Sequence, residues 1–63
     1  MNPKRKKYTY TVTVGDYGVD DVFFVQADTF KEAAEIAKRK FIRLYWRRKE
    51  LKAFMESKSE NLL

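Results

Sequence analysis

Arginine side chains recur at every fourth position in the second half of the chain. Residues four apart lie on the same side of an α-helix, so Arg39, Arg43 and Arg47 would form one stripe. Guanidinium groups at this spacing can contact successive phosphates of a nucleic-acid backbone. Trp46 lies beside the stripe, where its indole could stack on a base. The pattern therefore predicts an anionic partner, and nucleic acid in particular.

A second basic group lies near the start of the chain, at Lys4, Arg5, Lys6 and Lys7. We expect residues 1–7 to form a flexible basic arm of the kind that wraps nucleic acid. The whole chain has 14 Lys and Arg residues against 9 Asp and Glu residues, and this net charge of +5 also favours an anionic partner. Asn and Gln, which read base edges, are scarce and lie outside the stripe, so we expect sequence-tolerant binding. We expect DNA in preference to RNA as the partner.

The same charges could instead be neutralised within the molecule. A helix that follows a hairpin runs back across the sheet and ends near the hairpin turn. Asp16, Asp20 and Asp21 would then lie close to Arg43 and Arg47. At the other end of the helix, the basic arm would meet acidic residues of the first turn. The sequence alone leaves both arrangements open.

Catalytic chemistry has little support in this sequence. The chain has no His and no Cys, and Ser57 and Ser59 have no plausible base beside them. The aspartates near residue 20 lack the spacing of a calcium loop, which makes a solvated turn the better interpretation. We expect no enzymatic activity, no metal site and no cofactor.

Two segments have the pattern of β-strands. Over residues 7–14, tyrosine and valine alternate with lysine and threonine, which predicts a half-buried strand. Gly15 and Gly18 lie in the turn that follows, and residues 22–27 are again rich in β-branched and aromatic side chains. The two segments predict a β-hairpin.

The periodicity becomes helical after this hairpin. Thr29 and Glu32 form a capping-box pattern, and apolar residues then recur on one arc from Phe30 onward. We predict a helix that packs on the hairpin as far as Arg47 and overhangs it over residues 48–56. The predicted fold is α+β, with a two-stranded antiparallel hairpin followed by one long helix (ββα) over residues 8–56 and a frayed tail over residues 57–63.

Several apolar side chains have no cover in this predicted fold. Val22 and Phe24 lie on the outer face of the hairpin, and Leu51, Phe54 and Met55 lie on the overhanging helix. A chain of 63 residues without a disulfide or zinc site has marginal stability, and a second copy is the simplest source of cover. We therefore predict a homodimer. The alternative function is a protein-interaction module or inhibitor that uses these residues to bind a host protein.

The sequence also favours a cytoplasmic location. No apolar segment follows the basic start as in a signal peptide, and the longest apolar run, residues 22–25, is far shorter than the roughly 20 residues that cross a membrane. We expect no membrane partner.

The junction "FFVQADTFKEAAEIAKRKF" resembles the amino-terminal arm-type DNA-binding domain of tyrosine integrases, over about residues 8–41. In that family the sheet enters the major groove, so the resemblance implies a reading surface formed by Thr9, Thr11, Thr13, Phe24 and Gln26. This sequence shows no clear third strand and few basic residues on its strands, unlike the family. The same junction is similar to that of HicB-type antitoxins, and the short basic chain resembles small accessory proteins of phages and mobile elements.

Overall fold

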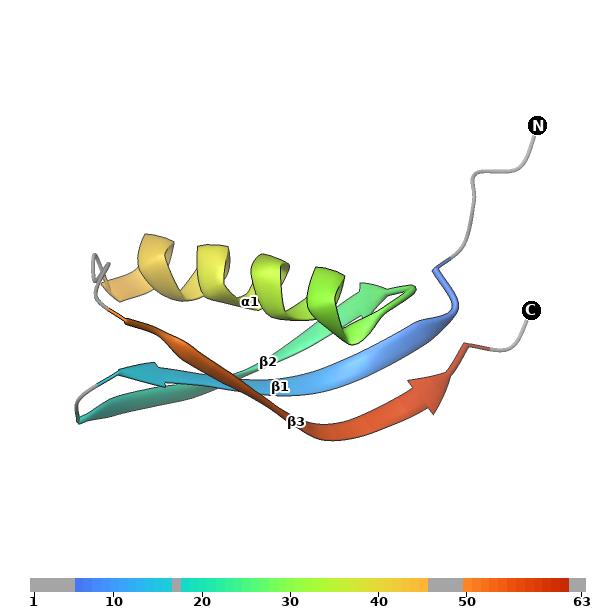
Figure 1. The fold of residues 1–63 in the computed structure, drawn as a ribbon, viewed down its shortest axis with the longest axis horizontal. Helices are drawn as coiled ribbons and strands as arrows, with labels where there is room; N and C mark the ends of the chain where they lie inside the picture. Colours follow the sequence, from blue (N-terminus) through green and yellow to red (C-terminus); the bar gives the residue numbers. More distant parts are fainter. Residues whose placement is uncertain (1–5, 17, 46–49, 62–63) are drawn as a thin grey trace.

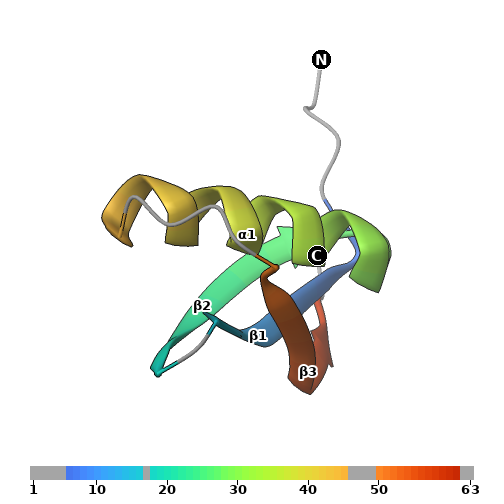
Figure 2. The ribbon, with the colours of Figure 1, turned by 60° about the vertical axis from the view of Figure 1, so that its left-hand side comes forward.

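Three β-strands and one helix make up the fold, and the helix lies between the second and third strands in the chain. The computed structural model describes residues 6–16, 18–45 and 50–61. In these ranges the elements are β1 (Tyr8–Asp16), β2 (Val19–Ala27), α1 (Phe30–Tyr45) and β3 (Lys52–Glu60). The strands form one antiparallel sheet in the order β2-β1-β3, with β1 at its centre. Helix α1 covers one face of this sheet (Figures 1 and 2).

The predicted hairpin is confirmed. Strands β1 and β2 pair in register from Tyr8 opposite Ala27 to Asp16 opposite Val19. Gly18 in the turn has φ of 88°, a conformation that costs glycine little because it has no Cβ. Alternate residues of β1 point toward α1 and are buried, as the alternation in the sequence predicts.

A capping box starts helix α1. The hydroxyl oxygen of Thr29 accepts the backbone N–H of Glu32 at 3.2 Å, and the Glu32 carboxylate accepts the backbone N–H of Asp28 at 3.1 Å. These bonds satisfy donors that the first turn of a helix leaves without partners. The described part of the helix extends to Tyr45, and the predicted end at Arg47 lies outside the described residues.

Strand β3 corrects the predicted two-stranded ββα arrangement, although the α+β class is confirmed. Residues 52–60 pair with β1, where the sequence predicted an overhanging helix followed by a frayed tail. Strand β3 is an edge strand, exposed along most of its length, so its polar sequence lacks the alternation that marks a half-buried strand. Leu51, Phe54 and Met55 are therefore not helical. Leu51 is partly buried against the core, and the other two lie on β3.

The end of β3 is fastened to the start of β1 by Asn61. Its side-chain amide donates to the carbonyl oxygen of Lys6 at 3.0 Å, and its side-chain oxygen accepts the hydroxyl of Thr9 at 2.7 Å. Its backbone N–H donates to the carbonyl oxygen of Lys7 at 2.7 Å. Residues 57–61 thus have defined partners on β1, in contrast to the predicted frayed tail.

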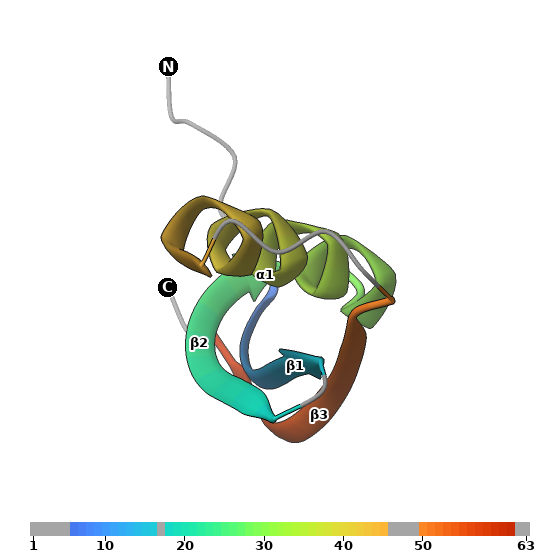
Figure 3. The same cartoon turned by 90° about the vertical axis from the view of Figure 1, so that its left-hand side faces the viewer.

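The hydrophobic core lies between α1 and the sheet, two layers that Figure 3 shows from the end of the molecule. Phe41 is its largest fully buried side chain. Phe23 is partly buried and packs against this core. The buried residues are Tyr10, Val12, Val14, Val25, Ala27, Ala33, Ala37 and Phe41. Among the helices of the described residues, none is long and apolar enough to cross a membrane.

Replacing Phe41 with alanine should cost about 3–5 kcal/mol of unfolding free energy, because it removes the largest side chain of a small core. Leu44→Ala is the control, since Leu44 is 59% exposed one turn further along the same helix. It should change the unfolding free energy by about 0.5 kcal/mol or less. Urea titration followed by circular dichroism measures both values. Equal losses in the two variants would contradict this assignment of the core.

Candidate nucleic-acid interface

The outward side of α1 carries two exposed arginines. Ala37 and Phe41 are buried against the sheet, so Arg39 and Arg43, which follow each of them by two residues, point away from it. Among the residues that the structure describes, no carboxylate lies within 4.0 Å of either guanidinium group, and the one ion pair found is elsewhere. Both arginines are therefore available to an outside anion.

Three lysines extend the positive charge of α1. Lys31 and Lys40 are exposed and Lys38 is partly exposed. Glu35 is exposed on the same helix and opposes them. Glu35 and Arg39 are four residues apart on the helix, but no ion pair joins them within 4.0 Å. The charge on this part of the helix thus remains predominantly positive.

Other residues of the predicted binding set fall outside the described part of the chain. These are Lys4, Arg5, Trp46 and Arg47.

Lys6 is committed to an internal ion pair. Its ammonium group donates to the carboxylate of Glu32 at 2.8 Å. This hydrogen bond and the charge of Glu32 raise the pKa of Lys6, and the same bond, with the N–H of Asp28, lowers the pKa of Glu32. The backbone N–H of Lys7 donates to the Asp28 carboxylate at 2.9 Å. At this end of the helix, the predicted contact between the arm and acidic residues is confirmed.

At the other end of α1, Tyr45 is joined to the second strand. Its hydroxyl donates to the carboxylate of Asp21 at 2.7 Å. This bond, followed by the backbone N–H of Val22, lowers the pKa of Asp21, and the Asp21 carboxylate raises the pKa of Tyr45. The helix therefore returns to the hairpin end of the sheet, as predicted. Among the described residues, the phenol of Tyr45 meets Asp21 and Arg43 does not, whereas Arg47 lies outside the described part.

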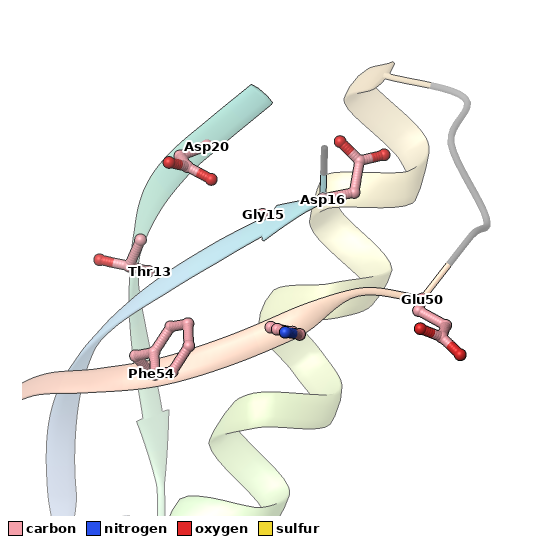
Figure 4. A pocket seen from close by; sticks show the side chains of 7 residues that line it. Thr13, Gly15, Asp16, Asp20, Glu50 and Phe54 are labelled. Atoms are coloured by element: carbon pink, nitrogen blue, oxygen red, sulfur yellow. The ribbon is translucent and has the colours of Figure 1, made fainter. Parts of the chain in front are cut away.

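A shallow depression of about 260 Å³ lies at the hairpin end of the sheet (Figure 4). Three carboxylates line it and one ammonium group opposes them, so it is predominantly acidic. No group of three or more His, Cys, Asp or Glu residues suited to a metal ion occurs among the described residues. An anionic ligand is disfavoured here and favoured on the outward side of α1. The lining residues are Thr13, Gly15, Asp16, Asp20, Glu50, Lys52 and Phe54.

The sheet has an outer face that α1 does not cover. Val22 is 47% exposed and Phe24 is 72% exposed on this face, as expected from the sequence. Thr13 pairs with Val22 on one side and with Phe54 on the other, so Phe54, 57% exposed, lies on the same face. The sequence placed Phe54 on a helix and missed this grouping. We call Val22, Phe24 and Phe54, with Thr9, Thr11 and Thr13 between them, the outer sheet face.

Met55 is 51% exposed on β3, but its register partner Val12 points toward α1, so it does not belong to the outer sheet face.

Comparison with family models, curated proteins and solved structures finds no match to this chain.

The Lys6–Glu32 pair predicts a difference in acid stability. The folded-state pKa of Glu32 is lowered, so its contribution to the unfolding free energy is present above its unfolded pKa and disappears as the pH falls through the folded value. Glu32→Gln should therefore destabilise the protein at pH 7 and have a smaller effect at about pH 2. Denaturant titration at both pH values measures the change.

Glu35→Gln is the matched control for this experiment, because Glu35 is exposed on the same helix and forms no ion pair within the described residues. Its effect on the unfolding free energy should be small at both pH values. An equal pH dependence in the two variants would show that the Lys6–Glu32 contact does not form.

Proposed function

We propose that this chain binds nucleic acid, duplex DNA in preference to RNA, through the outward side of α1. The observation that supports this most is the exposure of Arg39 and Arg43 without a described carboxylate in ion-pair distance. Carboxylates that lie at the two ends of the helix are bound elsewhere, Glu32 to Lys6 and Asp21 to Tyr45. The carboxylates of the protein therefore leave Arg39 and Arg43 without an ion-pair partner among the described residues.

The spacing of the two arginines suits a phosphate backbone. Residues four apart on an α-helix are separated by about 6 Å along its axis. Phosphates follow one another every 3.4 Å or so along the axis of each DNA strand, so Arg39 and Arg43 can reach phosphates of one strand about two steps apart. Contacts to phosphates position a protein without reading the base sequence, so binding should be sequence-tolerant and strongly dependent on salt.

Lys7 and residues outside the described part complete this proposal. Arg47 follows Arg43 by four positions in the sequence, and Trp46 precedes it, so they extend the proposed contact set together with Lys4, Arg5 and Lys7. Lys6 contributes less, because its charge is paired with Glu32. The outer sheet face is a weaker DNA-reading surface than the integrase resemblance implies. Exposed Asp20 and Glu56 add negative charge to the strands that border it.

The double variant Arg39→Gln/Arg43→Gln should weaken binding to a short DNA duplex and reduce its dependence on salt. Each lost phosphate contact removes about 0.9 from the slope of log K against log salt concentration, so two contacts remove about 1.8. Fluorescence anisotropy at several salt concentrations measures this slope.

Lys58→Gln is the control for charge alone. Lys58 is exposed on β3, where its ammonium group lies 4.4 Å from the centre of the Tyr8 ring. Its removal should leave the slope nearly unchanged. The proposal fails if the unmodified protein does not bind DNA at low salt, or if the double variant and the control behave alike.

The second candidate function is binding to a host protein, as an inhibitor of the phage or mobile-element type would do. The exposure of Phe24 on the outer sheet face favours it, since a large aromatic side chain at this level of exposure is a typical interface anchor. Affinity capture from a nuclease-treated bacterial lysate separates the two candidates. Recovery of one protein in stoichiometric amount, lost in Phe24→Ser, would support the second candidate.

A further inference from the structure

The outer sheet face groups exposed apolar side chains with three threonines, two of which already have hydrogen-bond partners. The hydroxyl of Thr13 donates to the Glu56 carboxylate at 2.9 Å, and the hydroxyl of Thr9 donates to Asn61 at 2.7 Å. Covering these threonines would therefore not strand their hydroxyl donors. Their methyl groups, with the side chains of Val22 and Phe24, are suited to contact with another protein surface.

Each edge of the sheet carries one feature that disfavours pairing with a further strand. On β2, the backbone N–H of Val22 donates to the carboxylate of Asp21 at 2.8 Å, so this donor is not free for another chain. The same carboxylate group accepts the hydroxyl of Tyr45, which holds it in place. On β3, a bulge opposite Thr11 and Val12 interrupts the regular edge. Features of this kind disfavour edge-to-edge association, which favours the outer sheet face as the surface through which two sheets meet.

Two opposite charges lie at the same position along the strands, one on each strand that flanks β1. Gly15 of β1 pairs with Asp20 of β2 and with Lys52 of β3. A second copy turned by 180° about an axis parallel to β1 places its β3 over β2 and its β2 over β3. Lys52 of each copy then meets Asp20 of the other, and Phe54 of each copy meets Val22 of the other. These contacts between Lys52 and Asp20 and between Phe54 and Val22 each occur twice, as a two-fold interface requires.

We propose that two copies of this chain pack through their outer sheet faces in this orientation, and that the dimer bridges two nucleic-acid segments. The dimer rests on the sheet geometry, and the bridging rests also on the proposed function. Two aligned three-stranded sheets of this length cover roughly 400 Å² on each copy in projection, at strand spacings of about 4.8 Å. The total of about 800 Å² lies below the range of standard specific interfaces, so the dimer is weak and forms at micromolar or higher concentration.

The bridging follows from the position of α1. The helix covers the face of each sheet opposite to the outer sheet face, so in the dimer the two helices lie on opposite outer sides. Arg39 and Arg43 of the two copies then point in opposite directions. The distances from helix to sheet, from sheet to sheet and from sheet to helix are each about 10 Å, so the two helices are roughly 30 Å apart. One duplex cannot contact both arginine pairs in this arrangement, whereas two duplexes can each contact one.

Charge reversal tests the dimer. Sedimentation velocity at low salt should show concentration-dependent dimerisation of the unmodified protein. Asp20→Lys and Lys52→Asp should each raise the dimer dissociation constant about tenfold, because two attractive pairs become repulsive. An equimolar mixture of the two variants should dimerise again, since every facing pair is then attractive. Glu35→Lys, the same charge change on exposed α1, should leave dimerisation unchanged.

Three outcomes would overturn the dimer. These are a monomer at all concentrations, no effect of either reversal in folded protein, or no recovery in the mixture. A monomer would leave the outer sheet face to a different protein. Circular dichroism verifies that the variants fold, and both side chains are exposed.

Bridging is tested with two duplexes of the same sequence, one attached to beads and one carrying a fluorophore. The unmodified protein should retain the fluorescent duplex on the beads. Asp20→Lys should bind a single duplex but retain much less of the second, and Arg39→Gln/Arg43→Gln should lose both activities. Binding and dimerisation without retention would overturn the bridging alone. Absence of binding to a single duplex would instead overturn the proposed function, while sedimentation still decides the dimer.

Discussion

The hydrogen-bonding requirement of β1 is the constraint on which the rest of the structure depends. Its buried side chains, Tyr10, Val12 and Val14, form much of the core, so the strand must stay in place. A strand at the edge of a two-stranded hairpin would leave half of its backbone groups to water or to another chain. Pairing with β3 satisfies this edge within one molecule. Completion of the sheet in the monomer therefore removes the reason for the dimer that the sequence predicted through the helix.

The parts of the fold that the sequence predicts are those with strong local patterns. The alternation of β1 and the cap at Thr29 and Glu32 are set by neighbouring residues, and the structure contains both. Strand β3 could not be predicted in this way. Ser57, Lys58 and Ser59 have no buried face, and their strand conformation depends on hydrogen bonds to β1 almost fifty residues earlier in the chain. Long-range pairing of this kind leaves no period in the sequence.

The same distinction holds for the candidate site. Arg39 and Arg43 share one side of a helix by local geometry, and the structure leaves both exposed. The pairing of Lys6 with Glu32 joins residues 26 positions apart, and only the path of the chain determines which carboxylate a basic arm meets. Phe54 lies on the same face as Val22 for a similar reason, because the long-range register of β3 determines its place on the outer sheet face. Local patterns thus predicted the helix surface well and the sheet surface only in part.

The two faces of this small domain divide its possible interactions. The core lies between α1 and the sheet, and the side chains buried in it cannot contact a partner. Basic side chains remain on the outward side of α1, and apolar side chains remain on the outer sheet face. Because these surfaces point in opposite directions, a partner on one does not block the other (Figure 3). The proposed nucleic-acid partner and the proposed second copy would therefore not exclude each other, and in the proposed two-fold arrangement the nucleic acids would lie on opposite outer sides of the dimer.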